Sequence, residues 1–521
     1  MDTVINPDRS SEAADVVAFL RRSALIDPGR VAVASGDIEC TYAQLLALVQ
    51  SWAKRLPKSV GGMPEPIAVV AEHDSVVPEL YLGVMAAGHA VIPLSTRLPD
   101  EVIARIVALA GVRLGILAPS AKHRKRGLAE SAASTRWISN EEDPRSQSLP
   151  ETRVPLPDGT AMVSFTSGTT GEPKGVVLSH LNLVTHGLTG AITYRAITEN
   201  VHVNPMPLAH FAGASRVILA IVNSGTHVIL PEFAPRDVLQ AVVDWHGTHL
   251  MVVPTMAADL LAVDPENYDL GALTLIYGAA PMPMPLAGSL VERLQCDLVN
   301  GYGLTESSAL ATALGPEAHR RAVADGDHEL LGSVGQAVPG IELQIVDETL
   351  REVPPGVSGQ IVLRGPKVSR GYLNRPTETA ERFLPDGWLL TRDEGRLSSS
   401  GNLTILGRMD DMIITGGVNV QPLEVENEAV LIEGVVECAV FAVPSDRWGQ
   451  EVRLAVVSAL GSEVDPEHVR SFLRQRLDPY KVPKSVHIVN ELPRSTLGKI
   501  QRGNLTSVFS KDNVEAEGAN G

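Results

Sequence analysis

The chain of 521 residues has few cysteines, few aromatic residues and no long apolar run. Its cysteines, Cys40, Cys296 and Cys438, are far apart and match no metal-ligand spacing, and their scarcity suits a reducing cytoplasm. No stretch approaches the roughly 20 apolar residues that a membrane helix needs, and the most apolar stretch contains Arg216. The opening Met-Asp-Thr shows no basic-then-apolar signal pattern. These features predict a globular cytoplasmic protein without a membrane span.

Basic residues are outnumbered by acidic ones. The formal net charge of −17 disfavours nonspecific binding to nucleic acid. One basic cluster, residues 122–126, lies in a polar, serine-rich stretch and is interpreted as a solvated loop. The length is too great for one core and suggests about two to four domains.

The most informative segment, residues 164–175, reads Ser-Phe-Thr-Ser-Gly-Thr-Thr-Gly-Glu-Pro-Lys-Gly. Buried strands are predicted before it, over 161–165, and after it, over 175–178, so the segment is a polar loop between strands. Its glycines let backbone amides approach an anion, and its hydroxyls and Lys174 add donors and charge. It is not the common P-loop, because Gly175 follows the lysine. The loop is predicted to hold a polyphosphate.

A second segment, Asn300-Gly301-Tyr302-Gly303-Leu304-Thr305-Glu306, combines glycines, an aromatic ring, a hydroxyl and a carboxylate. Tyr302 can stack on a purine, and Thr305 can bond a phosphate oxygen. Glu306 can hold Mg²⁺, which prefers carboxylate and phosphate oxygens. Alone, the segment would be read as a tight turn with a surface glutamate.

Together the two segments resemble the phosphate loop and the Tyr-Gly-x-Thr-Glu motif of the adenylate-forming superfamily. This superfamily comprises acyl- and aryl-CoA ligases, adenylation domains of peptide synthetases, and luciferases. Residues 277–281, Tyr-Gly-Ala-Ala-Pro, resemble its adenine-binding loop. The family usually has Ser or Gly in place of Tyr277, so this side chain either shortens the acyl pocket or packs outward.

Two further motifs concern the acyl group and the ribose. Residues 205–213, which include His210, resemble the acyl-site motif of CoA ligases, and the resemblance makes His210 a gate between acyl pocket and CoA tunnel. No acidic residue lies between 206 and 225 to pair with the amine of an amino acid. Thr391-Arg392-Asp393 resembles the Thr-Gly-Asp motif, which implies that Asp393 binds ribose, with Arg392 in place of the usual glycine.

The last two motifs lie near the C-terminal end. Gly407-Arg408-Met409-Asp410-Asp411 resembles the hinge motif, in which Arg408 would contact ribose or phosphate and Asp410 would be the pivot. Residues 493–500 resemble the C-terminal catalytic loop, with Lys499 as its mobile cation. The whole resemblance spans roughly residues 25–505.

Strand and helix patterns alternate up to about residue 330, and short strands separated by Gly and Pro follow. The predicted class is α/β, with a large N-terminal domain (1–409) of layered α/β subdomains plus a β-rich subdomain. A small mobile C-terminal α+β domain (410–521) follows a hinge at Asp410, and the tail 511–521 is predicted to be disordered.

The resemblance implies ATP-dependent conversion of a carboxylic acid to an acyl-adenylate, followed by thioester formation with CoA. The implied substrates and cofactor are ATP, Mg²⁺ at Glu306, CoA and a small acid. The implied catalytic residues are Thr166, Lys174, His210, Glu306 and Lys499. The implied nucleotide-binding residues are Thr166, Ser167, Gly168, Thr169, Thr170, Gly171, Lys174, Gly278, Ala279, Ala280, Pro281, Asn300, Gly301, Tyr302, Gly303, Thr305, Asp393, Arg408 and Lys499.

Two alternatives remain. The acceptor is instead a carrier-protein phosphopantetheine, supplied in trans because no carrier domain follows residue 507, or an amine. Otherwise the chain is a non-catalytic ligand-binding relative, which the joint presence of Lys174, Glu306, Asp393 and Lys499 opposes. The 4% aromatic content and the absence of acidic residues over 206–225 favour an apolar acyl or aryl substrate.

Overall fold

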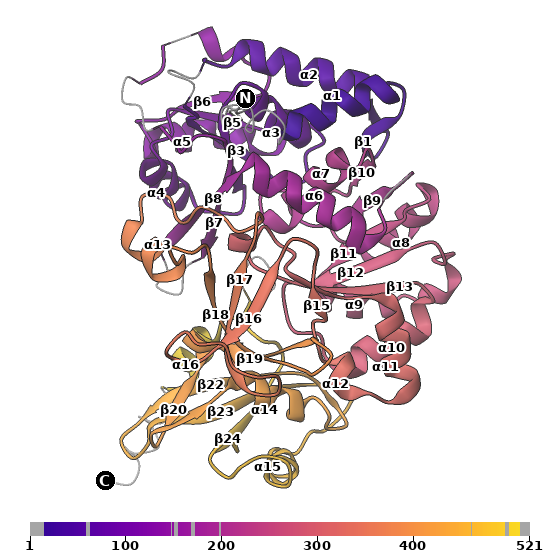
Figure 1. Ribbon diagram of the computed structural model, residues 1–521, viewed down its shortest axis with the longest axis vertical. Coiled ribbons are helices and arrows are strands. Elements are labelled where there is room, and N and C mark those ends of the chain that lie inside the picture. The colour runs from indigo at the N-terminus through magenta and orange to yellow at the C-terminus, as the bar shows by residue number, and fades with distance from the viewer. Residues whose placement is uncertain are drawn as a thin grey trace, which may run out of the picture.

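The computed structural model describes residues 15–58, 63–146, 148–150, 155–167, 172–196, 199–459, 461–494 and 500–510. Two large sheets with their helices occupy one end of the molecule, and an antiparallel sheet lies in the middle (Figure 1). A smaller sheet with its own helices occupies the other end (Figure 1). Among the described helices, none has the length and apolar character needed to cross a bilayer.

The six-stranded sheet carries the phosphate hairpin at one edge. Its order is β6-β5-β3-β4-β7-β8, and all neighbours are parallel except the last pair. The strands are β3 (Pro66–Ala71), β4 (Ala90–Ser95), β5 (Leu114–Leu117), β6 (Arg136–Ser139), β7 (Thr160–Ser167) and β8 (Pro173–Ser179). The helices before and between them are α1 (Val16–Ile26), α2 (Tyr42–Arg55), α3 (Val77–Ala86), α4 (Asp100–Ala110) and α5 (Lys125–Ser131). Strands β3 and β4 are buried along their whole length, as expected of parallel strands covered on both faces.

The nine-stranded sheet has the order β15-β14-β13-β12-β11-β9-β10-β1-β2, with a parallel centre and antiparallel strands at both edges. Its strands are β1 (Val31–Ser35), β2 (Ile38–Thr41), β9 (Val201–Asn204), β10 (Thr226–Ile229), β11 (His249–Val252), β12 (Thr274–Gly278), β13 (Asp297–Tyr302), β14 (Thr312–Leu314) and β15 (Gln336–Ala337). Its helices are α6 (His180–Tyr194), α7 (Phe211–Val222), α8 (Pro235–Asp244), α9 (Pro254–Leu261), α10 (Met284–Leu294), α11 (Pro316–Asp325) and α12 (His328–Leu331). Helices α6 and α7 share one apolar core with strands of both sheets, so the two sheets sandwich them.

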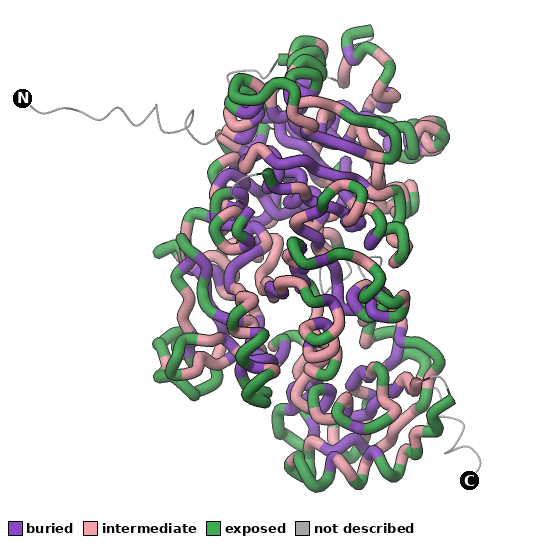
Figure 2. Tube along the Cα trace, turned by 90° about the vertical axis from the view of Figure 1, so that its right-hand side faces the viewer, coloured by how far each residue is buried: buried purple, intermediate pink, exposed green. Residues whose placement is uncertain are grey.

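The antiparallel sheet and the C-terminal module follow in chain order. The antiparallel sheet contains β16 (Glu342–Val346), β17 (Ser358–Arg364), β18 (Leu389–Leu397) and β19 (Leu403–Arg408), with α13 (Pro376–Arg382) between β17 and β18. The module contains β20 (Ile413–Thr415), β21 (Val418–Val420), α14 (Pro422–Ala429), β22 (Val435–Ser445), β23 (Gly449–Ser458), α15 (Pro466–Arg474), β24 (Ser485–Val489) and α16 (Arg502–Phe509). The module buries two apolar clusters of its own, and purple buried segments run through its centre in Figure 2. The predicted α/β class, with a β-rich part and a smaller C-terminal domain, is confirmed.

Residues 120–146, which contain the basic cluster, belong to the six-stranded sheet and its helices. They form α5 and the edge strand β6, where Trp137 and Ile138 are buried. The basic cluster lies in a 3₁₀ turn (Pro119–Arg124) and the start of α5 rather than in a loop. Each of four basic side chains in the cluster forms an ion pair with an acidic side chain: Lys122 with Glu141, Arg124 with Asp100, Lys125 with Glu142, and Arg126 with Glu130. These partners lie elsewhere in the sequence or one helical turn away, so a linear charge run could not reveal them.

Candidate active site

The predicted phosphate loop is flanked by β7 and β8, which pair as antiparallel neighbours. Thr166 lies opposite Lys174 in the register, and the Thr166 hydroxyl donates to the Lys174 carbonyl at 3.4 Å. The two strands predicted on either side of the loop are therefore present. Gly168, Thr169, Thr170, Gly171 and the side chain of Ser167 lie outside the described residues.

Glu306 and Lys174, predicted from distant segments, meet at Tyr372. Glu306 lies in a short 3₁₀ turn (Thr305–Ser307) and is 9% exposed. Its Oε1 accepts a 2.7 Å hydrogen bond from the Tyr372 hydroxyl, and Lys174 Nζ lies 5.7 Å from the centroid of the Tyr372 ring. Burial and the Glu306 charge raise the pKa of Tyr372, so this hydroxyl remains a donor. The arrangement holds one carboxylate and one ammonium beside the phosphate hairpin.

Sequence reasoning missed Tyr372. An isolated antiparallel bridge pairs it with Val176 of β8, which brings the 366–373 segment against the hairpin. No spacing in the linear sequence connects Tyr372 with Glu306, so only the long-range pairing could have identified it.

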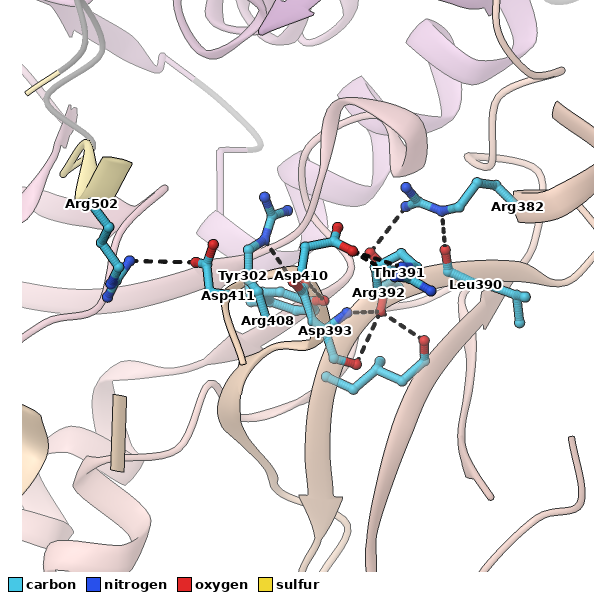
Figure 3. A network of polar contacts seen from close by, with 11 residues as sticks. Tyr302, Arg382, Leu390, Thr391, Arg392, Asp393, Arg408, Asp410, Asp411 and Arg502 are labelled. Atoms are coloured by element: carbon cyan, nitrogen blue, oxygen red, sulfur yellow. Dashed lines mark hydrogen bonds and ion pairs between the residues drawn. The ribbon is translucent and has the colours of Figure 1, made fainter. Parts of the chain in front are cut away.

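Asp393 is the centre of a second polar cluster (Figure 3). This carboxylate is 5% exposed and lies in β18. Its Oδ2 accepts a 2.6 Å hydrogen bond from the Tyr302 hydroxyl, and its Oδ1 accepts a 3.0 Å hydrogen bond from Arg408 Nε. Three residues predicted from separate motifs therefore converge. A carboxylate fixed in this way offers its remaining lone pairs as acceptors for a diol.

Arg392 adopts the left-handed backbone conformation, with φ of 64°. The family motif has glycine at this position, and glycine takes that conformation without a steric cost. The Arg392 side chain extends to the proposed pivot, with Nε and Nη2 at 3.2 and 2.5 Å from Asp410 Oδ1 (Figure 3). The next residue, Asp411, faces Arg502 of α16 at 3.4 Å. The hinge segment is thus ion-paired on both sides.

The predicted adenine loop follows β12, next to β13. Gly278 pairs with Gly301, and a Cβ added to Gly278 would lie 2.3 Å from the Gly301 carbonyl oxygen. Only glycine permits that approach. Asn300 donates to the Ser333 carbonyl at 3.5 Å. The remaining predicted residues, Ala279, Ala280, Pro281, Gly303 and Thr305, are half-buried or exposed in the loops that follow these strands.

The two alternatives for Tyr277 are resolved. Tyr277 is 1% exposed and packs among Leu260 and Leu290 in the core beneath α9 and α10. Its hydroxyl donates to His319 Nε2 at 2.7 Å, because His319 Nδ1 already donates to the Gly315 carbonyl. Burial lowers the pKa of His319 and keeps it neutral. Tyr277 is a packing residue.

His210 is the N-cap residue of α7, and its backbone amide donates to the Pro207 carbonyl at 3.2 Å. Burial lowers the pKa of its imidazole, and the charges that act on it are those of Glu72 and Arg97. Lys499 lies outside the described residues, and its flanks, Arg494 and Ile500, form an isolated antiparallel bridge.

These clusters in a layered α/β fold define a nucleotide-binding enzyme with two domains. The model of the AMP-binding enzyme family matches residues 20–373, and that of the AMP-binding enzyme C-terminal domain matches residues 424–499. The chain belongs to this family, which confirms the predicted resemblance.

Relatives with established names cover almost the whole chain. A feruloyl-CoA synthase from Amycolatopsis sp is 34% identical over 94% of this chain and 98% of its own. A fatty acid–[acyl-carrier-protein] ligase from Streptomyces coeruleorubidus is 30% identical over 94% of this chain and 95% of its own. The crystal structure of ATP-bound MatB from Rhodopseudomonas palustris has 30% identity and a TM-score of 0.84, covering 95% of this chain and 99% of that one.

Proposed function

We propose that the chain converts a carboxylic acid with an apolar acyl or aryl body to its adenylate with ATP, and then to its CoA thioester. The broad class, an AMP-forming acid–thiol ligase, is that of the family and of its CoA-ligase relatives. The observation that carries the proposal is the meeting of Glu306, Lys174 and Tyr372 beside the phosphate hairpin.

The adenylation step is proposed to use both clusters. Asp393, oriented by Tyr302 and Arg408, accepts from the ribose hydroxyls. The loop 166–171 and Lys174 neutralise the phosphates, and the loop 278–281 at the end of β12 takes the flat base. The acid carboxylate attacks the α-phosphate and pyrophosphate leaves. Preorganised charge and in-line positioning, rather than a general base, lower this barrier.

Glu306 is the proposed holder of Mg²⁺. In the described part of the chain, no group of three or more ligating side chains could bind a metal ion by itself. A buried glutamate beside the phosphate hairpin fits Mg²⁺, which usually takes one or two carboxylates and completes its shell with water and phosphate oxygens. The ion would neutralise charge on the phosphates.

The second step is proposed to need a different domain orientation. We divide the chain at Asp410 into residues 1–409 and 410–521, so that rotation about Asp410 moves Lys499 away and opens a path for the CoA thiol. His210, at the start of α7, is the proposed gate of that path. The three cysteines are free, which supports a reducing, cytoplasmic location. The carrier-protein alternative is favoured by one relative, and hydroxylamine trapping followed by addition of CoA, carrier protein or amine distinguishes the acceptors.

Glu306→Gln tests the proposal, since it keeps the shape and removes the charge. We expect a loss of about 2–4 kcal/mol of transition-state stabilisation in acid-dependent pyrophosphate release, the size of one preorganised electrostatic contact. Glu317→Gln, a change in a glutamate whose side chain is 81% exposed in α11, is the control and should behave as wild type. Unchanged pyrophosphate release by Glu306→Gln would refute the site assignment.

A further inference from the structure

Arg216 of α7 is a buried arginine that forms no ion pair with any side chain in the described part of the chain. It is 3% exposed, and its Nε and Nη1 atoms are buried without a hydrogen bond. Its guanidinium carbon lies 5.1 Å from the centroid of the Tyr194 ring. Burying an unpaired ion costs several kcal/mol, and proteins seldom keep one without a use.

The described surroundings of Arg216 supply no negative charge to balance it. His186 of α6 is fully buried, and burial lowers the pKa of its imidazole well below the usual value, so the ring is neutral. Lys367 is also fully buried, and its Nζ donates to the Leu310 carbonyl. Burial and then the charge of Arg216 lower the pKa of Lys367 to about 7. Over the described residues, no carboxylate forms an ion pair with Arg216 or Lys367.

This buried cluster, Arg216, His186 and Lys367, lies behind the nucleotide motif. The Ser308 hydroxyl donates to the Lys367 carbonyl at 2.7 Å, and the Ser369 amide donates to the Glu306 carbonyl at 2.7 Å. The segment that carries the buried lysine therefore supports the Glu306 turn. A Cβ placed on Gly301 would lie 3.6 Å from the Tyr194 hydroxyl, so the aromatic neighbour of Arg216 borders the nucleotide motif as well.

The position along α7 relates the cluster to the acyl group. Arg216 follows His210 by six residues, about 9 Å along the helix axis. An acid whose reacting carboxylate meets the α-phosphate near Glu306 would extend its far end along this helix. That end would reach an arginine rather than an entirely apolar wall.

We propose that Arg216 binds a second carboxylate at the far end of the acid substrate, so that the enzyme activates dicarboxylic acids. A guanidinium binds a carboxylate with two parallel hydrogen bonds, which would satisfy the Nε and Nη1 donors left unpaired in the structure. The neutral imidazole of His186 supplies a further N–H donor, and Lys367 supplies an amine that the bound carboxylate would keep protonated. The inference rests on the proposed function, because it assumes that the acyl group lies beside α7.

Matched acids test the inference in the full-length enzyme. Pyrophosphate release is measured with straight-chain dicarboxylates and monocarboxylates of equal length, and with para-carboxyphenylpropanoate against para-methylphenylpropanoate. We expect the best dicarboxylate to exceed its monocarboxylate partner by roughly 100-fold in kcat/KM, as for a buried charge-assisted contact. Arg216→Met should abolish that ratio while it retains activity on monocarboxylates, and Arg216→Lys should keep part of it.

Thermal unfolding separates a ligand site from a structural arginine. Without ligand, Arg216→Met should raise the Tm, because it removes an unpaired buried charge. Arg113→Met is the control, since buried Arg113 is paired with Glu65, and this change should lower the Tm without altering the acid ratio. A wild-type preference for monocarboxylates at every length, or an unchanged ratio in Arg216→Met, overturns the second-carboxylate site and leaves the proposed function standing. If neither the dicarboxylates nor the monocarboxylates lead to pyrophosphate release, both the second-carboxylate site and the proposed function are overturned.

Discussion

Arg392 shows how a single residue can depart from a family pattern and acquire a contact. At a φ of 64°, a residue with a Cβ costs roughly 1–2 kcal/mol relative to glycine. The Arg392–Asp410 ion pair is partly exposed, at 43% and 27% for the two side chains, so it returns at most about 1 kcal/mol. The strained arginine therefore contributes a link to the hinge rather than net stability.

Two substitutions at this position separate strain from ion pairing. Arg392→Ala loses the ion pair and keeps the strained backbone, whereas Arg392→Gly loses the pair and relieves the strain. We expect the glycine variant to be more stable than the alanine variant by about 1 kcal/mol, measured from urea midpoints at constant m-value. Equal stabilities would show that the backbone at residue 392 is not strained.

At the residue scale, the motifs named residues that the fold brings together, whereas partners supplied by the fold alone had no signal in the sequence. Tyr302 and Arg408, from two separate motifs, both contact Asp393 of a third, and their roles toward the nucleotide stay predictions. The Tyr372–Glu306 and Arg392–Asp410 contacts were not predictable from the sequence. Each joins two segments that only the folded chain brings together, and no spacing between them indicates the contact.

At the scale of elements, three adjacent parallel strands carry one row of buried histidines. His227 of β10, His202 of β9 and His249 of β11 are aligned in the register. The His202 and His249 rings stack at 4.7 Å, and each ring nitrogen contact found is to a neutral group. Burial, and then Arg216, lower the pKa of His227 to about 3, and burial lowers that of His249 to about 4. The three rings stay neutral in the fold.

This histidine row predicts acid sensitivity. Below about pH 6.5 the unfolded chain binds protons at these rings and the folded chain does not, so the stability of the fold decreases as pH decreases. Each ring contributes up to about 1.4 kcal/mol per pH unit over that window. In urea unfolding between pH 7 and pH 5, His227→Gln should reduce the slope of stability against pH by about one proton. The exposed His328→Gln should leave it unchanged, and an equal effect of the two changes would contradict the assignment.

The strands themselves were predictable, because runs such as 250–253 and 273–276 are apolar and short. Their order was not, since β9 lies between β10 and β11 only through crossovers that the sequence pattern does not encode. The histidine row is a product of that order. The edge strand β6 was missed for a similar reason: only Trp137 and Ile138 of its four residues are buried, so its pattern is too short to read.

At the scale of the whole molecule, contacts across the hinge hold the C-terminal module against the antiparallel sheet. Gln421, just before α14, donates to Glu394 of β18 at 2.5 Å, and Asp410 accepts from Arg392 of β18 at 2.5 Å. Both contacts are polar, and both join one domain to the other or to the hinge. Polar contacts of this kind exchange with water at little cost when domains separate, so the fold is suited to two orientations.

Two variants test the two-orientation mechanism by separating its half-reactions. Lys499→Ala should abolish adenylate formation from acid and ATP, because the lysine is proposed to bridge the carboxylate and the α-phosphate. The same variant, supplied with synthetic acyl-adenylate and CoA, should form thioester at close to the normal rate, since rotation removes Lys499 from the adenylate. Asp410→Pro, which restricts φ at the pivot, should largely keep adenylation and lose thioester formation.

Asp410→Ala is the matched control for the pivot, because it breaks the ion pair with Arg392 and leaves φ free. If the pivot acts through its backbone, Asp410→Ala should retain both half-reactions, and only the proline variant should lose the second. If the ion pair itself sets the orientation, the alanine variant should shift the balance between the two rates without abolishing either. Equal failure of Lys499→Ala and Asp410→Pro in both half-reactions would mean that this chain does not alternate between two orientations about residue 410.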